Sequence, residues 1–427
     1  MLSHEAFRLS NDVRAHLVCS GSTEAVTVLV LCRVGSRYEP SHLAGASHLI
    51  EHMLFKGTRR WPTALEISRQ LDAIGAEYNA YTDKDVTGYY VKADASHLPL
   101  AARILSEMLW QSRFAPHELA RERGVVLEEI KMYQDHPAAQ AEMLLEEMVF
   151  EGNALGREIA GSPETVRSLR CSDLLAFHRR AYQPGRLVVA VAGKVDQRAR
   201  AVLEQAFGKK QATEKDLSLF SPFIPLTGGL RIRAKHRVTE QAHLAIGFSS
   251  FALSDPRHAA TKLLAVLLGG TASSRLFLSV REKKGLAYSI RASQTPYEDT
   301  GLFAIQAGLE KTRFPLALRT IFGELRAVRK HGVTAEELRR AKGYLRGTFL
   351  LALEDSSDQA AFFARRDLFL GQAESPEAFL RRIERVRLSD VQRTAADIFQ
   401  PDRMRAIVVG SYRTDAEASA VFPLSCL

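Results

Sequence analysis

Residues 45–58 read Gly45-Ala46-Ser47-His48-Leu49-Ile50-Glu51-His52-Met53-Leu54-Phe55-Lys56-Gly57-Thr58. Nothing between the two outer glycines interrupts a helix, and on that helix His48 and His52 are one turn apart with Glu51 on the same face. Two imidazoles and a carboxylate in this arrangement suit Zn²⁺, which takes nitrogen ligands and works with a base beside its water. A solvated helix face is the ordinary alternative, but only 13 of the 427 residues are histidine, so chance seldom produces the pattern. The stretch therefore predicts a zinc helix.

A catalytic zinc ion needs a third protein ligand, and the best candidate lies in a second helical stretch over residues 122–132. There Glu122 and Glu129 are seven residues apart and share one face, while Glu128 points about 100° away and is expected to be solvated. A glutamate-rich helix is more often a salt-bridged surface. Its combination with the histidine pair favours the metal site.

The order His-x-x-Glu-His is the inverse of the commoner zinc-protease motif and is the inverzincin signature. At this point the sequence resembles the M16 metallopeptidase family, which includes pitrilysin, insulin-degrading enzyme and the mitochondrial processing peptidase. The resemblance spans nearly the whole chain, and its motifs lie at residues 35–39, 48–58, 75–82 and 122–129. As in the family, 76 residues separate His52 from Glu129. The resemblance thus implies Glu129, and not Glu128, as third ligand, with Glu122 supporting a metal-binding imidazole.

Composition places the chain among ordinary globular proteins, with 46% hydrophobic and 25% charged residues. Its length allows two or three domains. The longest apolar run, residues 26–34, is too short to span a bilayer and is typical of a buried strand. The four cysteines are far apart and predict free thiols rather than a disulfide framework. Because the first residues also lack a leader pattern, we expect a cytoplasmic protein.

The net charge of +9 raises the question of nucleic-acid or membrane binding. Lysine and arginine are dispersed along the chain, and the densest patch, residues 231–237, has no interleaved aromatic side chains. We therefore expect neither a nucleic-acid partner nor a membrane partner.

The pattern of apolar residues predicts alternating helices and strands. Residues 7–34 are expected to form two strands joined at 20–22, followed by the zinc helix. Further elements are listed in chain order: a helix at 64–74, strands at 77–82 and 85–92, helices at about 98–114, from 116 and at 138–150, then a helix, a turn and a strand over 170–193.

The second half of the sequence repeats the first. Residues 170–173 match 387–390 at an offset of 217, and the same offset pairs 182–184 with 399–401 and Gly193 with Gly410. We therefore predict an α+β fold of two homologous α/β domains. Each would have a mixed, mostly antiparallel sheet with helices packed on one face, and the two would close like a clamshell around a central chamber. Residues 1–207 would form the zinc-binding domain, 208–229 a linker rich in proline and glycine, and 230–427 the second domain.

The second copy cannot build the same metal site. Aligning Leu119 with Leu338 places Ala341 opposite Glu122 and Thr348 opposite Glu129, and residues 259–270 contain no histidine. The prediction is one Zn²⁺ per chain, held by the first domain, beside a metal-free second domain.

Residues 280–289 of the second half resemble the family's Arg/Tyr segment. The resemblance implies that Arg281 holds the substrate backbone and that Tyr288 donates a hydrogen bond to the developing oxyanion. From residue types alone, a surface arginine and a half-buried tyrosine would be the commoner interpretation. The resemblance also implies that Asn79 and Ala80 lie on a sheet edge to which substrate adds as a strand.

The sequence thus predicts a zinc endopeptidase of the processing-peptidase type, in which Glu51 takes a proton from the attacking water. Its substrates would be extended peptides or unfolded segments bound in a closed chamber. Family members of this length usually pair, and this chain carries both the zinc set and the Arg/Tyr pair, so we expect a homodimer. One alternative is a non-catalytic structural or partner subunit of a heteromeric peptidase, although such subunits typically lose the zinc motif. Another is a metal-binding regulator, which would not need Glu51.

Overall fold

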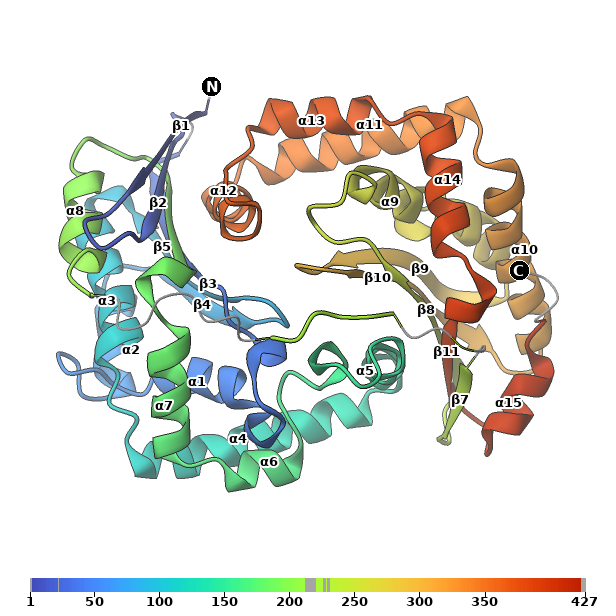
Figure 1. Ribbon diagram of the computed structural model, residues 1–427, viewed down its shortest axis with the longest axis horizontal. Coiled ribbons are helices and arrows are strands. Elements are labelled where there is room, and N and C mark those ends of the chain that lie inside the picture. Colours follow the sequence, from blue (N-terminus) through green and yellow to red (C-terminus); the bar gives the residue numbers. More distant parts are fainter. Residues whose placement is uncertain (1, 22, 212–219, 226–227, 229–230, 424–427) are drawn as a thin grey trace. The chain divides into compact units, whose positions relative to one another are not determined.

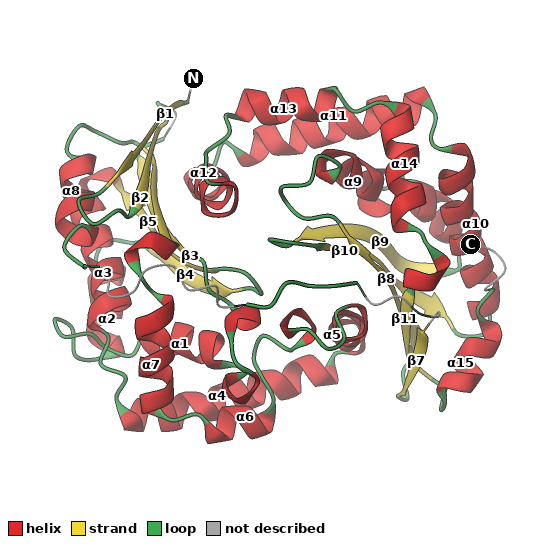
Figure 2. Ribbon diagram, viewed as in Figure 1, coloured by secondary structure: helices red, strands yellow, loops and turns green. Residues whose placement is uncertain are grey.

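The computed structural model describes residues 2–21, 23–211, 220–225, 228 and 231–423. The chain divides into two compact units (Figure 1). Unit 1 contains Met1–Ile130, Arg157–Ser221 and Phe349–Ser375, and unit 2 contains the three remaining segments, Lys131–Gly156, Pro222–Thr348 and Pro376–Leu427. Half of the predicted 208–229 linker, residues 212–219, 226–227 and 229, lies outside the described residues. Each unit combines one sheet with several helices, which confirms the predicted mixed α/β fold with two sheets (Figure 2).

The sheet of unit 1 has six strands in the order β1-β2-β6-β3-β5-β4. Only β2 and β6 pair in parallel, and the other neighbours are antiparallel. The strands are β1 Ser3–Arg8, β2 Arg14–Cys19, β3 Ala25–Cys32, β4 Glu77–Thr82, β5 Thr87–Asp94 and β6 Leu187–Gly193.

The prediction of two strands within residues 7–34 is wrong, because the structure has β1, β2 and β3 between residues 3 and 32. A tight turn, in which Leu9 and Val13 bond through their backbones and Asp12 has a φ of 68°, separates β1 from β2. Ser10, Asn11 and Asp12 are typical turn residues, so the sequence did indicate a turn between β1 and β2.

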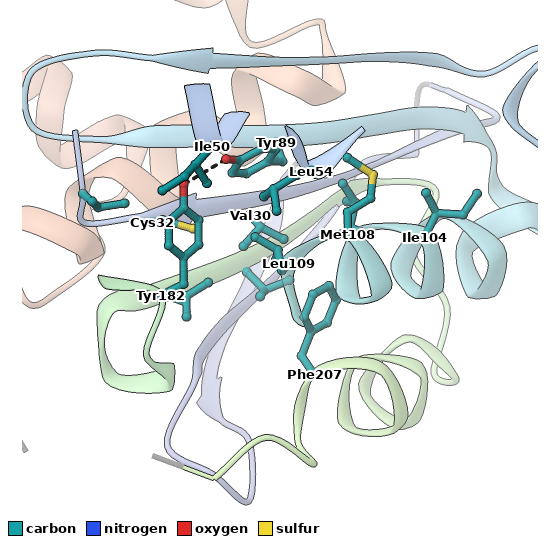
Figure 3. Close-up of a cluster of buried hydrophobic side chains, with 14 of the residues drawn as sticks. Val30, Cys32, Ile50, Leu54, Tyr89, Ile104, Met108, Leu109, Tyr182 and Phe207 are labelled. Carbon is teal, nitrogen blue, oxygen red and sulfur yellow. Dashed lines mark hydrogen bonds between the residues drawn. The ribbon is translucent and has the colours of Figure 1, made fainter. Parts of the chain in front are cut away.

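Helices of unit 1 pack their apolar sides against this sheet. In Figure 3, Ile50 and Leu54 of α1 meet Val30, Tyr89 and Leu109 inside one buried cluster. The hydroxyls of Tyr89 and Tyr182 share a hydrogen bond of 2.9 Å in the same cluster. The helices are α1 Ala46–Leu54, α2 Ala64–Asp72, α3 Leu98–Gln111, α4 Pro116–Asp135, α6 Pro163–Ser168, α7 Cys171–Ala181, α8 Ala199–Phe207 and α12 Ser356–Leu370.

The sheet of unit 2 has the order β7-β11-β8-β10-β9. Its strands are β7 Arg231–His236, β8 Gln241–Ser250, β9 Ala287–Pro296, β10 Gly301–Glu310 and β11 Arg405–Gly410. Its helices are α5 Pro137–Val149, α9 His258–Ala265, α10 Phe314–His331, α11 Ala335–Ala352, α13 Pro376–Glu384, α14 Leu388–Ile398 and α15 Asp415–Val421. Two π-helical turns, Val266–Gly270 and Phe277–Glu282, precede β9.

The two sheets have the same topology once β1 is set aside. In both, a parallel pair, β2 with β6 or β7 with β11, is followed by three antiparallel neighbours in matching order. The local repeat agrees: α7 and α14 each begin after an arginine whose N–H donates to the aspartate three residues on. The internal repeat seen in the sequence is therefore a repeat of the fold.

Each sheet is covered on both faces, which corrects the prediction of helices on one face. In β3, Val28 and Val30 point into the cluster with α1 and α3, whereas Thr27 points the other way and bonds Ser356 of α12 at 2.8 Å. In unit 2, α5 lies against β11 and β8. Both α12 and α5 come from the opposite half of the sequence. The compact units therefore differ from the predicted domains, residues 1–207 and 230–427, by exchanging these segments.

Within the described ranges, no helix is long and apolar enough to cross a membrane. Cys19, Cys32 and Cys171 are free thiols, and Cys426 lies outside the described residues.

Candidate metal centre

Helix α1 presents its polar side chains on the face opposite the core. Leu49, Ile50, Met53 and Leu54 are fully buried in the cluster of unit 1. Because these apolar positions fix the rotation of the helix, the remaining face carries His48, Glu51 and His52, all partly buried.

Helix α4 brings Glu129 to the two histidines. Its Oε2 lies 3.6 Å from Nε2 of His48 and 3.9 Å from Nε2 of His52. In a tetrahedral zinc site with bonds of 2.0–2.1 Å, ligand atoms lie about 3.4 Å apart, close to these separations. Among the described residues this is the one cluster of three such side chains with ligand atoms within 4.8 Å of one another. The donor set, two imidazoles and a carboxylate, fits Zn²⁺.

The protonation state of His48 suits a metal ligand. Burial and the neighbouring His52 lower the pKa of His48 to about 4, so its imidazole is neutral at physiological pH. Its other ring nitrogen, Nδ1, is buried and has no hydrogen-bond partner among the residues that the structure describes.

Glu122, two turns before Glu129 on α4, holds His52. Its Oε2 lies 3.0 Å from Nδ1 of His52, and its Oε1 lies 2.8 Å from Nζ of Lys56. Burial alone would raise the pKa of Glu122, but the hydrogen bonds from Lys56 and His52 outweigh it and hold the pKa below its usual range. The anionic carboxylate accepts a hydrogen bond from the Nδ1–H of His52, whose Nε2 is then free of a proton and directed at the Glu129 carboxylate. Glu128 is exposed.

Glu51 is the carboxylate beside the ligand set. Thr82, at the end of β4, donates a hydrogen bond of 2.5 Å to its Oε2. Burial raises the pKa of Glu51, and Glu129 acts in the same direction, while Thr82 and His52 act against them. A carboxylate with a raised pKa next to a metal site is a suitable proton acceptor.

Asn79 and Ala80 lie on β4, which is the edge strand of the unit 1 sheet. Asn79 Oδ1 accepts a hydrogen bond of 2.8 Å from the Ala80 N–H. Tyr78, Ala80 and Thr82 are every second residue of the strand, so they share the face that lies toward α1. The predicted edge position is confirmed, and a role in binding substrate stays a prediction.

Arg281 and Tyr288 lie side by side in unit 2. The Arg281 guanidinium is 6.0 Å from the centre of the Tyr288 ring and 4.8 Å from that of Phe277. Tyr288, on β9, is 76% exposed. Both side chains are open to solvent, and their part in catalysis stays a prediction.

Three further residues support the site, although the sequence patterns assigned them no role: Thr82, Lys56 and Glu39. Lys56 is four residues after His52, and this helical spacing could have predicted that both side chains lie on one face of the helix. Thr82 reaches Glu51 only because β4 lies against α1, and no local pattern contains that contact. Glu39 accepts hydrogen bonds from the first amides of α1.

Two family models match the chain. Residues 16–163 match the model described as "Insulinase (Peptidase family M16)", and residues 168–345 match "Peptidase M16 inactive domain". A Streptomyces coelicolor protein named an uncharacterized zinc protease is 38% identical over 383 residues, covering 88% of this chain and 83% of the relative. A Bacillus subtilis protein with the same description is 33% identical over 402 residues, with coverages of 94% and 97%.

Solved structures share the fold. A protease from Helicobacter pylori superposes with a TM-score of 0.89 at 24% identity, covering 96% of this chain and all of that one. A Pseudomonas fluorescens structure titled a peptidase M16 inactive domain has a TM-score of 0.86 at 21% identity, with coverages of 97% and 99%. Together, the metal-ligand geometry, the repeated fold and the two relatives at 33% and 38% identity assign the chain to peptidase family M16.

Proposed function

We propose that this chain is a zinc-dependent endopeptidase that hydrolyses extended peptides or unfolded segments. The observation that carries the proposal is the convergence of His48, His52 and Glu129, from two helices, with Glu51 beside them. A metal-storage or structural site would have no use for a carboxylate of raised pKa at the edge of the ligand set.

The ligand set would hold one Zn²⁺ per chain through Nε2 of His48, Nε2 of His52 and the carboxylate of Glu129. When bound, zinc acts as a Lewis acid that makes water nucleophilic at neutral pH and polarises the scissile carbonyl. Glu122 keeps the His52 ring oriented through the Nδ1 hydrogen bond of 3.0 Å.

Glu51 would serve as general base and then as general acid. It accepts the proton of the attacking water and passes it to the amine that leaves when the peptide bond breaks. The Thr82 hydroxyl engages Oε2, so Oε1 is the oxygen left for that exchange. Burial, the largest influence on the Glu51 pKa, moves it upward, toward neutrality, where both transfers are fast.

The substrate would lie along β4 as an added strand. An edge strand offers backbone groups to an extended peptide and rejects folded surfaces, which cannot pair with it. The Ala80 N–H is engaged by the Asn79 side chain, so an incoming strand would displace that bond or extend it. Arg281 and Tyr288 would contribute a cation and a phenol that stabilise negative charge on the substrate.

The decisive variant is Glu51→Gln. It keeps the size of the side chain and removes the proton acceptor, so peptide cleavage should fall by at least about 10²-fold while zinc content stays near one per chain. Cleavage would be followed with a peptide library and metal content by elemental analysis. Glu128→Gln, an exposed change on α4, is the matched control and should keep both. Unchanged cleavage in Glu51→Gln would refute the assignment of the base.

The alternative is a non-catalytic partner subunit. The match of residues 168–345 to the family model described as an inactive domain supports it. That role predicts zinc binding without cleavage by the purified chain, and cleavage only after a second chain type is added.

We also propose that the chain acts as a cytoplasmic homodimer. Light scattering of the purified protein would give its mass, and fractionation of cells would test the compartment.

A further inference from the structure

A buried carboxylate lies at the amino end of the metal helix. Glu39, 4% exposed, accepts hydrogen bonds from the N–H of Gly45 at 2.8 Å and of Ser47 at 2.6 Å. The first amides of a helix lack partners within it, and a buried carboxylate is costly unless donors surround it. Each group therefore satisfies the other, and the start of α1 is tied to the preceding segment.

The segment that carries Glu39 is itself fixed in place. Arg157 donates a hydrogen bond of 2.5 Å to the Glu39 carbonyl, and Lys84 donates one of 2.6 Å to the Arg157 carbonyl. Arg37 forms a buried ion pair with Asp85 at 2.9 Å. Lys84 and Asp85 belong to the turn between β4 and β5. The carboxylate is thus anchored to the strand pair that carries Thr82.

The backbone before α1 also has little freedom to shift. Gly45 has a φ of 94°, and a Cβ at this position would meet the carbonyl oxygen of Ala160 at 2.6 Å. Only glycine suits both the dihedral angle and the close approach. Glu39 therefore binds the start of a helix whose backbone conformation is already restricted at Gly45.

The two metal-binding histidines are supported differently. His52 has Glu122 on its Nδ1, the usual arrangement for a metal-binding imidazole. His48 has no partner on its buried Nδ1 within the described structure. Since no described side chain holds Nδ1 by a hydrogen bond, the position of His48 depends more on the backbone of the first turn of α1, where Glu39 accepts the N–H of the adjacent residue, Ser47.

We propose that Glu39 is a positioning residue for His48, acting through the amide of Ser47 and touching neither metal nor substrate. The inference rests on the proposed zinc site. It differs from a purely structural cap in one consequence: loss of the Glu39 hydrogen bonds should weaken zinc binding more than the loss of an equivalent cap elsewhere.

The chain offers a matched control on the next helix. Glu66 accepts the Thr63 N–H at 2.9 Å and belongs to the capping box of α2, which carries no metal ligand. Glu39→Gln and Glu66→Gln each replace one capping oxygen by an amide group. Zinc affinity would be measured on the full chain by chelator competition at pH 8, and the order of α1 by amide hydrogen exchange.

We expect Glu39→Gln to weaken zinc affinity by about 10-fold or more and to speed exchange at the start of α1. Glu66→Gln should change zinc affinity by less than about twofold. Should Glu39→Gln fail to fold, Arg157→Gln removes the anchor of the Glu39 carbonyl, keeps the carboxylate, and should weaken affinity in the same direction by a smaller factor.

Equal zinc affinity in wild type and Glu39→Gln, with faster exchange in α1, would overturn the proposal and leave Glu39 a plain helix cap. A wild-type chain that binds zinc but cleaves no peptide would contradict the proposed peptidase activity alone, since the affinity comparison would still decide the role of Glu39. A wild-type chain that binds no zinc would overturn both.

Discussion

Glu122 and Glu129 share one face of α4 but have different partners. Glu129 approaches Nε2 of both histidines, whereas Glu122 bonds Nδ1 of His52 and Nζ of Lys56. Because Glu122 contacts His52 at Nδ1, away from Glu129, Glu122→Gln should leave the proposed site able to bind zinc but weaken its affinity by about 10–100-fold. Chelator competition would measure the change.

The matched control for this prediction is Glu128→Gln, on the same helix but exposed, which should bind zinc as tightly as wild type. Complete loss of zinc in Glu122→Gln would mean that Glu122 is a ligand. Affinity equal to that of wild type would mean that the hydrogen bond to His52 has no effect on the metal.

At the residue scale, the spacing of His48 and His52 was enough to place both on one face of a helix, whereas the resemblance to the M16 family implied that Glu129 meets them. Helical periodicity fixes which side chains share a face, and both stretches are uninterrupted helices. Thr82 and Glu39 could not be assigned in this way. Their contacts, to Glu51 and to the first turn of α1, exist only after strands and helices pack, and residue spacing contains no trace of that packing.

At the element scale, an ion pair joins the helical residues just before the π-helical turn Phe277–Glu282 to helix α11. Arg275 binds Glu337 through two hydrogen bonds, of 2.7 and 2.8 Å, and Glu337 also accepts the Thr334 N–H at the start of α11. The hydrogen bonds from Arg275 are the main reason that the pKa of Glu337 falls to about 2. The folded state therefore favours the ionised carboxylate.

The pH dependence of stability follows from that shift. A carboxylate whose folded pKa is depressed stabilises the fold fully above its unfolded pKa, near 4.5, and loses that contribution as pH falls toward 2. We expect Glu337→Gln to lower the free energy of unfolding by on the order of 2 kcal/mol at pH 7, and by progressively less between about pH 4.5 and 2. Urea unfolding at several pH values would measure this.

Glu336→Gln provides the comparison for Glu337→Gln. Glu336 pairs with Arg340 on the surface of the same helix, 64% exposed, so its removal should cost at most about 0.5 kcal/mol at any pH. A Glu337→Gln deficit that stays constant from pH 7 to pH 3 would show that capping geometry, rather than charge, explains the loss.

Periodicity predicted the positions of several helices closely, and the predictions that failed did so because of local turn residues or tertiary packing. The helices α2 and α5 lie within two residues of their predicted bounds, because Thr63 and Pro137 mark their starts. The strand predicted through residues 7–19 failed at Ser10-Asn11-Asp12, where turn residues outweigh the flanking apolar pattern. Which sheet α12 covers was not predictable, because amphipathicity shows that a face is buried but not against what.

At the scale of the whole molecule, the two compact units exchange segments. The unit 1 sheet packs against α12, which buries Ala360, Phe363 and Leu368, and the unit 2 sheet packs against α5, which buries Ala141, Leu145 and Met148. Burying each large apolar side chain contributes roughly 1.5–3 kcal/mol. With two large side chains each, either helix contributes roughly 3–6 kcal/mol, which overlaps the lower end of the 5–15 kcal/mol that typically stabilises a native protein. The strands of each sheet lie in one half of the sequence, but one helix that covers each sheet comes from the other half.

This exchange predicts how the chain responds to division. Residues 1–207 expressed alone would keep α5 but lack α12, and residues 208–427 alone would lack α5, so each fragment should be insoluble or lack a cooperative thermal transition. The two co-expressed fragments should associate and recover cooperative melting, since every buried contact is then available. Circular dichroism and calorimetry would compare them with the intact chain. A native-like transition in isolated 1–207 would show that α12 is dispensable for the first sheet, and would restore the simple division of the chain into two sequential domains.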